Sequence, residues 1–366
     1  MAFIETLAAA CIGGGIFHLL RVPLAWMLGS MTFVMIWGGF SRRKLVWPTR
    51  LRNTGLILLG YMMGLPFTLE TGQQIVKQLP SMLAATAATM GFTILLGYLL
   101  SKLAGISLST ALIGSIPGGL TQMVVLSEEI KGADATAVTF MQTIRVFAVI
   151  FIVPFIATHG ISDSGGQSAA AGANPAAVGA MALHSLSWHT LLVGVWIALG
   201  TWTAVRLRFP TPYLLAPMLT SAMIVMAGLT APELPQFWIL AAQVTVGAHM
   251  GLIMKPANLQ NWKRLLPYTV LNSVAVVFFS MLIGFVLSWG HPISLLTGFL
   301  GTAPGGMTEM GVTATLMHAD LSIVVAYQMF RILFILFAVP PVLTWWLKRT
   351  APSANMLERG KRTNGF

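Results

Sequence analysis

The residues that could take part in chemistry are concentrated in one ten-residue stretch that occurs twice in the chain. Residues 114–123 read GSIPGGLTQM, and residues 301–310 read GTAPGGMTEM. Pro removes a backbone N–H and paired Gly weakens a helix, so both stretches predict a helix that is broken at Pro-Gly-Gly. The unpaired N–H groups at the start of the next half-helix carry a partial positive charge, which suits a carboxylate or another small anion.

The predicted binding residues are the two glycine pairs and the threonine two positions after each pair. The glycines would present backbone donors, and the threonines would add hydroxyl contacts. A hinge or a close helix crossing would also use small residues. The same motif at the same position of both halves favours the binding site. The residues are Gly118, Gly119, Thr121, Gly305, Gly306 and Thr308.

Two arginines are the sharpest intramembrane signals. Arg145 and Arg331 each lie about 11 residues into an apolar run that is otherwise almost uncharged. An ionised side chain there is expensive unless it is paired, which makes it a functional candidate. Gln142 and Gln328, three residues earlier, lie on the same helical face. We expect all four to contribute to substrate binding. The alternative is that each Arg ties its helix to the free carbonyls of the broken segment.

Glu309 breaks the symmetry of the two stretches, because its counterpart is Gln122. Desolvation at membrane depth favours a neutral carboxylic acid, which could carry a coupling proton. Proximity to Arg331 or to a helix N-terminus would instead keep the carboxylate ionised. The sequence leaves two interpretations open, a proton-coupling residue and a structural ion pair.

Sequence signatures of metal, cofactor and nucleotide sites are missing. The seven His show no ligand spacing, and the single Cys11 excludes an internal disulfide. The chain has no Gly-x-x-x-x-Gly-Lys-[Ser/Thr] stretch and no nucleophile–base arrangement. We therefore expect no cofactor, no metal and no enzymatic activity.

These residues are embedded in a chain with the composition of a polytopic membrane protein. It is 56% hydrophobic and 8% charged, against about 25% charged in soluble domains. The net charge of +11 comes from Lys and Arg in short loops, which indicates membrane topology rather than nucleic-acid binding. Twelve apolar segments are predicted, at roughly 2–20, 24–40, 51–68, 80–101, 106–130, 134–158, 185–205, 212–229, 236–254, 265–289, 293–318 and 321–347.

The chain contains an internal duplication. Positions match at an offset of 187 residues from Arg21 and Arg208 onward, and at 186 from Asp134 and Asp320 onward. The predicted organisation is a first membrane repeat at 1–160, a Gly/Ala/Ser-rich external linker at 161–184, a second membrane repeat at 185–347 and a basic cytoplasmic tail at 348–366.

The distribution of Lys and Arg distinguishes parallel from inverted halves. If every segment crosses the membrane, 11 lie inside and 8 outside; if residues 106–130 and 293–318 dip in and return, the counts become 17 and 2. The positive-inside rule favours the second arrangement. We therefore predict an all-α polytopic membrane protein with two inverted repeats, each of about five transmembrane helices and one re-entrant broken helix. The two tips would meet near the midplane.

The duplicated Gly-x-x-Pro-Gly-Gly-x-Thr-x-Met stretches and the Asp…Gln-x-x-Arg helices after them resemble the AbrB family of bacterial integral membrane proteins. The resemblance covers nearly the whole chain. Members of the family carry inconsistent labels, including ammonia monooxygenase, regulator of gene expression and transporter-like protein. No basic DNA-reading module is visible in the sequence, and no His or carboxylate cluster suits copper or iron. The resemblance implies no established substrate site.

The leading hypothesis is a secondary transporter in the bacterial inner membrane, with both termini cytoplasmic. It would move a small organic anion or metabolite, with Glu309 carrying a coupling proton. The second hypothesis is a membrane-embedded regulator or sensor of gene expression that acts through a partner, with Lys348–Phe366 as its cytoplasmic handle. Expected partners are the lipid bilayer and a small-molecule substrate, without nucleic acid; assembly with further copies of the chain stays open.

Overall fold

The computed structural model describes residues 2–161, 188–253 and 262–350, apart from residues 21, 42–44, 119, 131, 208, 210, 230 and 233. This part of the chain is all-α and contains no strand. Six of its helices are long and apolar enough to cross a membrane by length and composition. The predicted all-α polytopic membrane protein is confirmed. All but the first residue of the predicted linker, and residues 351–366 of the tail, lie outside the described residues.

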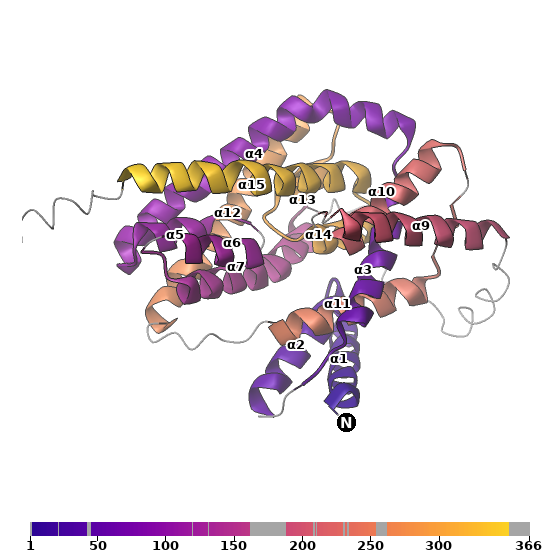
Figure 1. Cartoon of the computed structure of the whole chain (residues 1–366), viewed down its shortest axis with the longest axis horizontal. Helices are drawn as coiled ribbons and strands as arrows, with labels where there is room; N and C mark the ends of the chain where they lie inside the picture. The colour runs from indigo at the N-terminus through magenta and orange to yellow at the C-terminus, as the bar shows by residue number, and fades with distance from the viewer. Residues whose placement is uncertain are drawn as a thin grey trace, which may run out of the picture.

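The helices fall at the predicted apolar segments of both halves (Figure 1). The first half contains α1 (Ala2–Leu19), α2 (Ala25–Phe40), α3 (Thr49–Gly64), α4 (Leu69–Ala104), α5 (Leu108–Ser115), α6 (Leu120–Glu129), α7 (Ala135–Ile156) and the π-helical turn η1 (Ala157–Ile161). The second half contains α9 (Trp188–Arg206), α10 (Pro212–Met226), α11 (Gln236–Ile253), α12 (Trp262–Gly290), α13 (Leu295–Thr302), α14 (Met307–Leu316) and α15 (Leu321–Thr350).

Two helices begin earlier than the sequence predicts, α4 at Leu69 rather than near residue 80 and α12 at Trp262 rather than near residue 265. Pro80 lies inside α4 and Pro267 lies inside α12. A proline in a helix removes its own N–H donor and crowds the carbonyl four residues earlier. Pro80 and Val76, whose carbonyl loses its donor, are both exposed, so this carbonyl is not buried. The start of α4 is also fixed by a reciprocal capping box between Thr68 and Thr71.

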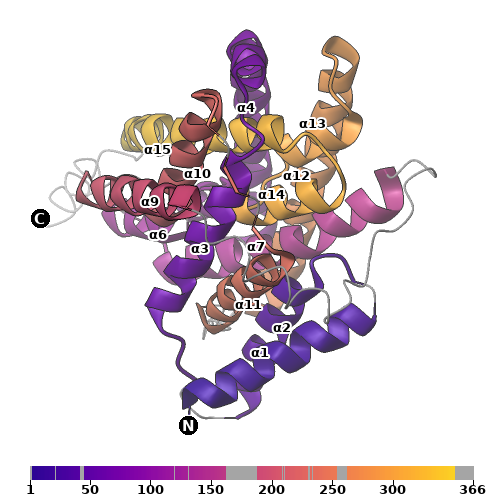
Figure 2. The same cartoon turned by 90° about the vertical axis from the view of Figure 1, so that its right-hand side faces the viewer.

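The helices of the two halves interlock instead of forming two separate bundles. Helix α3 packs against α10, and α11 packs against α2, which is the same contact with the halves exchanged. Helix α4 contacts α12 and α15, while α7 contacts α12. We call α1–α3 and α9–α11 the scaffold group, and α4–α7 and α12–α15 the hairpin group. In Figure 1, α1, α2 and α11 lie below most of the hairpin group, and Figure 2 shows the same three helices below it from the side, whereas α9 and α10 lie at its level in both views.

Glycines allow the closest helix contacts in the scaffold group. Gly60 and Gly64 on α3 lie against the backbone of α10, and Gly247 and Gly251 on α11 lie against the backbone of α2. A Cβ atom on any of the four would overlap a carbonyl oxygen of the facing helix. These Gly-x-x-x-Gly pairs therefore allow the two pairs of helices to pack with their backbones in contact.

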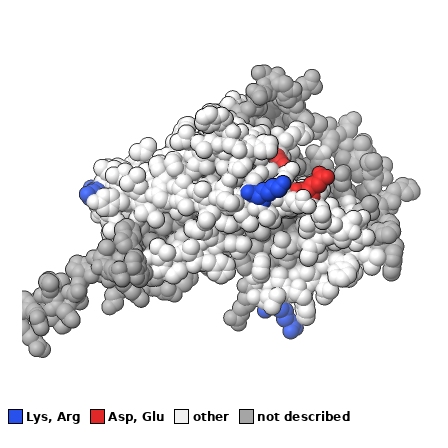
Figure 3. Space-filling model, turned by 90° about the horizontal axis from the view of Figure 1, so that it is seen from above, with Lys and Arg blue, Asp and Glu red and all other residues white. Residues whose placement is uncertain are grey.

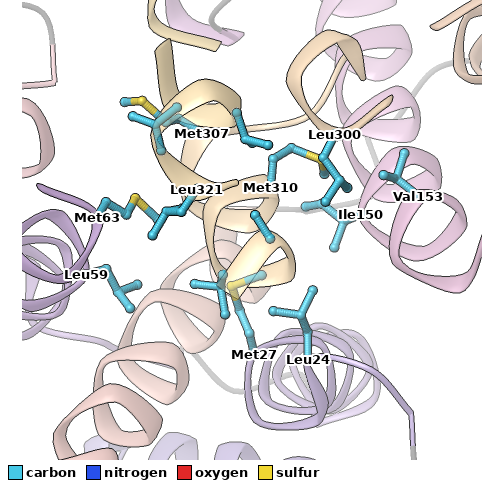
Figure 4. Packing of buried hydrophobic residues seen from close by; sticks show 14 of the residues in the cluster. Leu24, Met27, Leu59, Met63, Ile150, Val153, Leu300, Met307, Met310 and Leu321 are labelled. Atoms are coloured by element: carbon cyan, nitrogen blue, oxygen red, sulfur yellow. The ribbon is translucent and has the colours of Figure 1, made fainter. Parts of the chain in front are cut away.

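One buried apolar cluster joins the two groups. Figure 4 shows Met310 of α14 between Ile150 of α7 and the scaffold residues, which include Met27 and Met63. Burying one such side chain contributes about 1.5–3 kcal/mol. The cluster therefore seats the second broken segment on the scaffold group.

The outer surface of the described chain fits a lipid environment. Large apolar side chains are exposed on helices of both halves, including Phe40, Leu83, Trp196, Phe278 and Phe337. Figure 3 shows a face on which charged side chains are few. A soluble monomer rarely exposes so much contiguous apolar surface.

Candidate functional site

The first broken segment is a hairpin whose two ends lie side by side. Helix α5 enters and α6 leaves, and the Ser107 hydroxyl at the start of α5 donates to the carbonyl of Gly132, after α6, at 2.5 Å. The N–H of Asp134 donates to the hydroxyl of Thr110 at 2.8 Å. The segment therefore returns to the level at which it starts, as the sequence predicts for a re-entrant hairpin.

The second broken segment repeats this geometry. The N–H of Asp320, after α14, donates to the hydroxyl of Thr297 in the first turn of α13, at 3.1 Å. Asp134 and Asp320 also cap α7 and α15, because each carboxylate accepts from two backbone N–H groups of the following turn.

The tip of each hairpin is a tight turn centred on the motif proline. The N–H of Gly118 donates to the carbonyl of Ile116, and the N–H of Gly305 donates to that of Ala303, both at 2.8 Å. This is a three-residue turn, for which the fixed φ of proline is well suited. A Cβ on Gly118 or Gly305 would overlap the methionine five positions later. The methionine of each motif therefore folds back over the first glycine of the pair, which accounts for the spacing between the two residues.

In the first half, α7 holds the tip through two side chains. The amide nitrogen of Gln142 donates to the carbonyls of Ile113 and Ile116 at 2.9 and 3.0 Å. The guanidinium of Arg145 donates to Ile116 at 2.7 Å and to Gly118 at 3.3 Å. The Ile116 carbonyl thus accepts from three donors, and the free C-terminal carbonyls of α5 are satisfied in a buried site.

In the second half, α15 makes the equivalent contacts. Gln328 donates to Leu300 and Ala303 at 2.7 and 3.0 Å. Arg331 donates to the carbonyls of Thr302, Ala303 and Gly305 and to the side-chain oxygen of Gln328. These contacts are those of the alternative interpretation, in which each Arg ties its helix to the broken segment. A role of the four side chains in binding substrate stays a prediction.

The positive charge of the two arginines is not neutralised by these contacts, because every acceptor among the described residues is a neutral oxygen. Both side chains are only 4% exposed. The two guanidinium groups also interact electrostatically with each other across the two halves. The tips are therefore a buried, positively charged region to which both halves contribute.

The second tip presents backbone that a ligand can reach. Gly306 is exposed and is the N-cap of α14, without a side-chain hydrogen bond to cap it. Thr308 is buried in the first turn of the same helix. In the first tip, Gly118 is half-buried, while Gly119 and the side chain of Thr121 lie outside the described residues.

Glu309 lies in the first turn of α14 and is 2% exposed. Its carboxylate lies against Gly306, where a Cβ atom would overlap it. The Oε2 atom is buried and has no hydrogen-bond partner among the described residues. A carboxylate at a helix N-terminus is electrostatically favourable, so the position suits an acidic side chain. The proton-coupling role stays a prediction.

Two features of the site had no signal in the sequence. The acceptors that organise each tip are the backbone carbonyls of Ile116 and Ala303, which any residue could supply. Tyr327, one turn before Arg331, is buried beside the second hairpin and reads in the sequence as one more apolar position. In the described ranges, no group of three or more His, Cys, Asp or Glu comes together in a way that could hold a metal ion.

The fold and these hairpins define a class of protein, an all-α membrane protein with a duplicated broken helix. The chain belongs to the AbrB family, because the family model described as "Transition state regulatory protein AbrB" matches residues 26–347. It is 28% identical over 356 residues to "Uncharacterized protein YhjN" of Bacillus subtilis (strain 168), covering 92% of this chain and 90% of that protein. It is 27% identical over 334 residues to "Putative regulator AbrB" of Escherichia coli (strain K12), covering 89% and 91%.

Proposed function

We propose that the protein is a secondary transporter of a small organic anion in the bacterial inner membrane. The observation that carries the proposal is the pair of hairpin tips, each held by a buried arginine whose acceptors are all neutral. Uncompensated positive charge beside broken backbone is unfavourable in a membrane unless an anion visits it. Matched helix breaks in two halves are also the usual place of a transporter's binding site.

In this proposal the arginines act through their charge rather than through direct contact. The arginine N–H groups donate to the carbonyls of Ile116, Ala303 and the first glycine of each tip. The positive charge of the arginines then raises the electrostatic potential at the tip. The substrate carboxylate would accept from backbone N–H groups at Gly306 and at the equivalent Gly119. Thr308 and Thr121 would add hydroxyl donors. Charge and backbone donors together select an anion over a neutral metabolite.

Uptake by proteoliposomes tests the site. We expect one or more members of a panel of small mono- and dicarboxylates to show saturable counterflow in vesicles containing the full chain. Thr308→Val should lower that counterflow at least tenfold, while Thr315→Val, a hydroxyl deletion at the far end of α14, should leave it within twofold. Equal counterflow by both variants would contradict the site, and its absence for every member of the panel would contradict the substrate class.

Proton coupling through Glu309 is a separate part of the proposal, supported by the buried Oε2 atom without a partner. With Glu309→Gln, an imposed pH gradient should no longer drive accumulation, whereas counterflow without a gradient should persist. Glu70→Gln on the exposed start of α4 is the matched control and should keep gradient-driven accumulation. Wild-type flux that does not respond to the pH gradient would contradict the proton coupling but not the proposed binding site.

A membrane-embedded regulator acting through a partner is the second candidate function. It is favoured by the name of the Escherichia coli relative, "Putative regulator AbrB". In this second function the segment that follows α15, residues 351–366, would dock the partner. Deleting these residues distinguishes the two functions, since a regulator should lose its output and a transporter should keep its flux.

The remaining parts of the proposal concern placement and partners. Both termini would lie in the cytoplasm, and the linker between the repeats would lie outside. The partners would be the bilayer and the transported anion, with neither nucleic acid nor catalysis involved. This orientation follows from the 17-to-2 distribution of Lys and Arg in the re-entrant arrangement.

A further inference from the structure

The symmetry of the internal duplication holds within each of the two helix groups. In the scaffold group, α3 packs on α10 as α11 packs on α2. In the hairpin group, the equivalent residues Phe92 of α4 and Phe279 of α12 stack, with ring centroids 4.0 Å apart. The two tips are also held by equivalent glutamine and arginine side chains. Exchanging the two halves therefore reproduces the contacts within each group.

The contacts between the two groups do not follow this symmetry. Helix α3 packs against α14 and α15, whereas the equivalent helix α11 makes no comparable contact with α6 or α7 in the described ranges. Ser322, in the first turn of α15, is 2% exposed and donates to the carbonyl of Pro66, after α3, at 3.0 Å. The equivalent Thr136, in the first turn of α7, carries the same hydroxyl group but is exposed. In this structure the scaffold group therefore seats the second hairpin.

The first half carries residues suited to the contact that α11 lacks. In the contact that is present, the Met63 side chain of α3 lies against Gly311 of α14. The equivalent residues are Met250 on α11 and Val124 on α6, and both are half-buried. A methionine again faces the choice of a small or medium apolar partner. The duplication thus supplies a second contact surface of the same kind.

The boundary between the groups differs in chemistry from the contacts within them. Within the groups the closest contacts are made by glycine on backbone, such as Gly247 of α11 on α2 and Gly284 of α12 on α13. Between the groups they are made by methionine side chains, which include Met27, Met63 and Met310 (Figure 4). Methionine is unbranched and flexible, so it can repack against a new neighbour. The boundary between the groups is therefore the one that can slide.

We propose that the protein has a second conformation, in which the hairpin group has shifted as one body against the scaffold group. In that conformation α11 packs against α6 and α7, as α3 packs against α14 and α15 here, and the first hairpin is seated instead of the second. The existence of this conformation does not depend on transport. Its use, which is to open the site at the tips to each side of the membrane in turn, rests on the proposed function.

Disulfide cross-linking of the full chain in membranes tests the exchange of contacts. In a Cys11→Ser background, Met63→Cys with Gly311→Cys joins α3 to α14, and Met250→Cys with Val124→Cys joins α11 to α6. The Cγ atom of Met63, where a cysteine sulfur would lie, is 3.4 Å from the Cβ position on Gly311, which is close enough for a disulfide. Mild oxidation should cross-link both pairs. The mismatched pairs, 63 with 124 and 250 with 311, are controls that should stay reduced.

Two cross-linking results would overturn the proposal. One is a pair at 250 and 124 that stays reduced while the pair at 63 and 311 forms, because the protein would then have only the described arrangement. The other is cross-linking of matched and mismatched pairs alike.

Spin labels give a measurement that leaves the boundary between the groups intact. Phe40 on α2 and Trp289 on α12 are exposed and belong to different groups. Labels on Phe40→Cys and Trp289→Cys should give two distances. Labels on Phe40→Cys and Trp196→Cys, both in the scaffold group, should give one. A single distance for the first pair would also overturn the second conformation.

Counterflow in proteoliposomes separates this proposal from the proposed transport. Either disulfide should abolish counterflow, and reduction with dithiothreitol should restore it. A cross-link between 250 and 124 in a protein that shows no counterflow would contradict transport and support the second conformation. Counterflow that persists in both cross-linked proteins would contradict the use of the movement in transport.

Discussion

At the scale of single residues, each hairpin tip depends on a glutamine and an arginine acting on one carbonyl. Ile116 and Ala303 each accept from the tip glycine, from the glutamine and from the arginine. A carbonyl at the end of a broken helix would otherwise be buried without a donor. The Gln-x-x-Arg spacing puts both donors on one face of the next helix, so they reach the same tip.

Replacing the glutamine should destabilise the protein even where no ligand is present. Gln328→Leu keeps the volume but leaves the Leu300 carbonyl without this donor and removes the oxygen that accepts from Arg331. We expect a loss of about 1–3 kcal/mol, the usual effect of an unsatisfied buried polar group. The unfolding temperature of the purified protein measures it. Gln74→Leu on the exposed face of α4 is the matched control, and equal shifts for both variants would contradict the carbonyl-holding role.

Sequence reasoning at this scale found the correct side chains but not all of their contacts. Intramembrane charge singled out Arg145 and Arg331, and the Pro-Gly-Gly motif located the breaks. One of the two sequence interpretations had the arginines bind free carbonyls of the broken segments, but which individual carbonyls accept depends on how α7 and α15 align with the hairpins, which no local pattern encodes. Tyr327 gave no signal, because a buried tyrosine in an apolar helix reads as packing.

At the scale of helices, backbone contact between the halves depends on glycine. Gly247→Ala places a Cβ where the Met27 carbonyl lies, so α11 and α2 must separate. We expect a loss of about 1–3 kcal/mol, as for other overpacked sites. Gly91→Ala, on α4 with no atom within 4 Å of the new Cβ, should be neutral or stabilising by up to about 1 kcal/mol. Changes of opposite sign in the unfolding temperatures of the two variants support the close contact between α11 and α2, whereas equal destabilisation of both would contradict it.

Element boundaries show where sequence patterns were sufficient and where they were not. The breaks at Pro117 and Pro304 were predicted, because each proline is followed by two glycines inside an apolar run. Pro80 was taken as the start of a segment, although α4 begins at Leu69 and continues through it. The difference is physical, because a lone proline on an exposed face removes one hydrogen bond, while Pro-Gly-Gly also removes helix propensity.

At the scale of the whole molecule, the orientation of the two repeats is open to a direct test. Ser107 and Ser294 are exposed, precede α5 and α13, and occupy equivalent positions in the duplication. In a Cys11→Ser background, we expect a membrane-impermeant maleimide to label Ser294→Cys in intact spheroplasts. Ser107→Cys should react only after the membrane is permeabilised. Labelling of both cysteines from one side would contradict inverted repeats.

The division into a scaffold group and a hairpin group could not be obtained from the sequence. The fixed offset of the duplication indicates two similar halves, and the simplest expectation is two bundles side by side. Close contacts also run between the halves, with α3 on α10 and α11 on α2. The Gly-x-x-x-Gly spacings of α3 and α11 permit close packing but do not specify the partner, because a packing face has the same pattern whichever helix it meets.

The contacts of α15 with the second hairpin also imply an order of events during synthesis and membrane insertion of the protein. Helices α13 and α14 leave the ribosome before Gln328 and Arg331, so the carbonyls at their break enter the bilayer without the donors that later satisfy them. During translation the half-finished hairpin needs another source of hydrogen bonds, such as water within the insertion machinery. A nascent chain that stops before residue 328 would lack these donors, which marks α15 as the helix that completes the second hairpin.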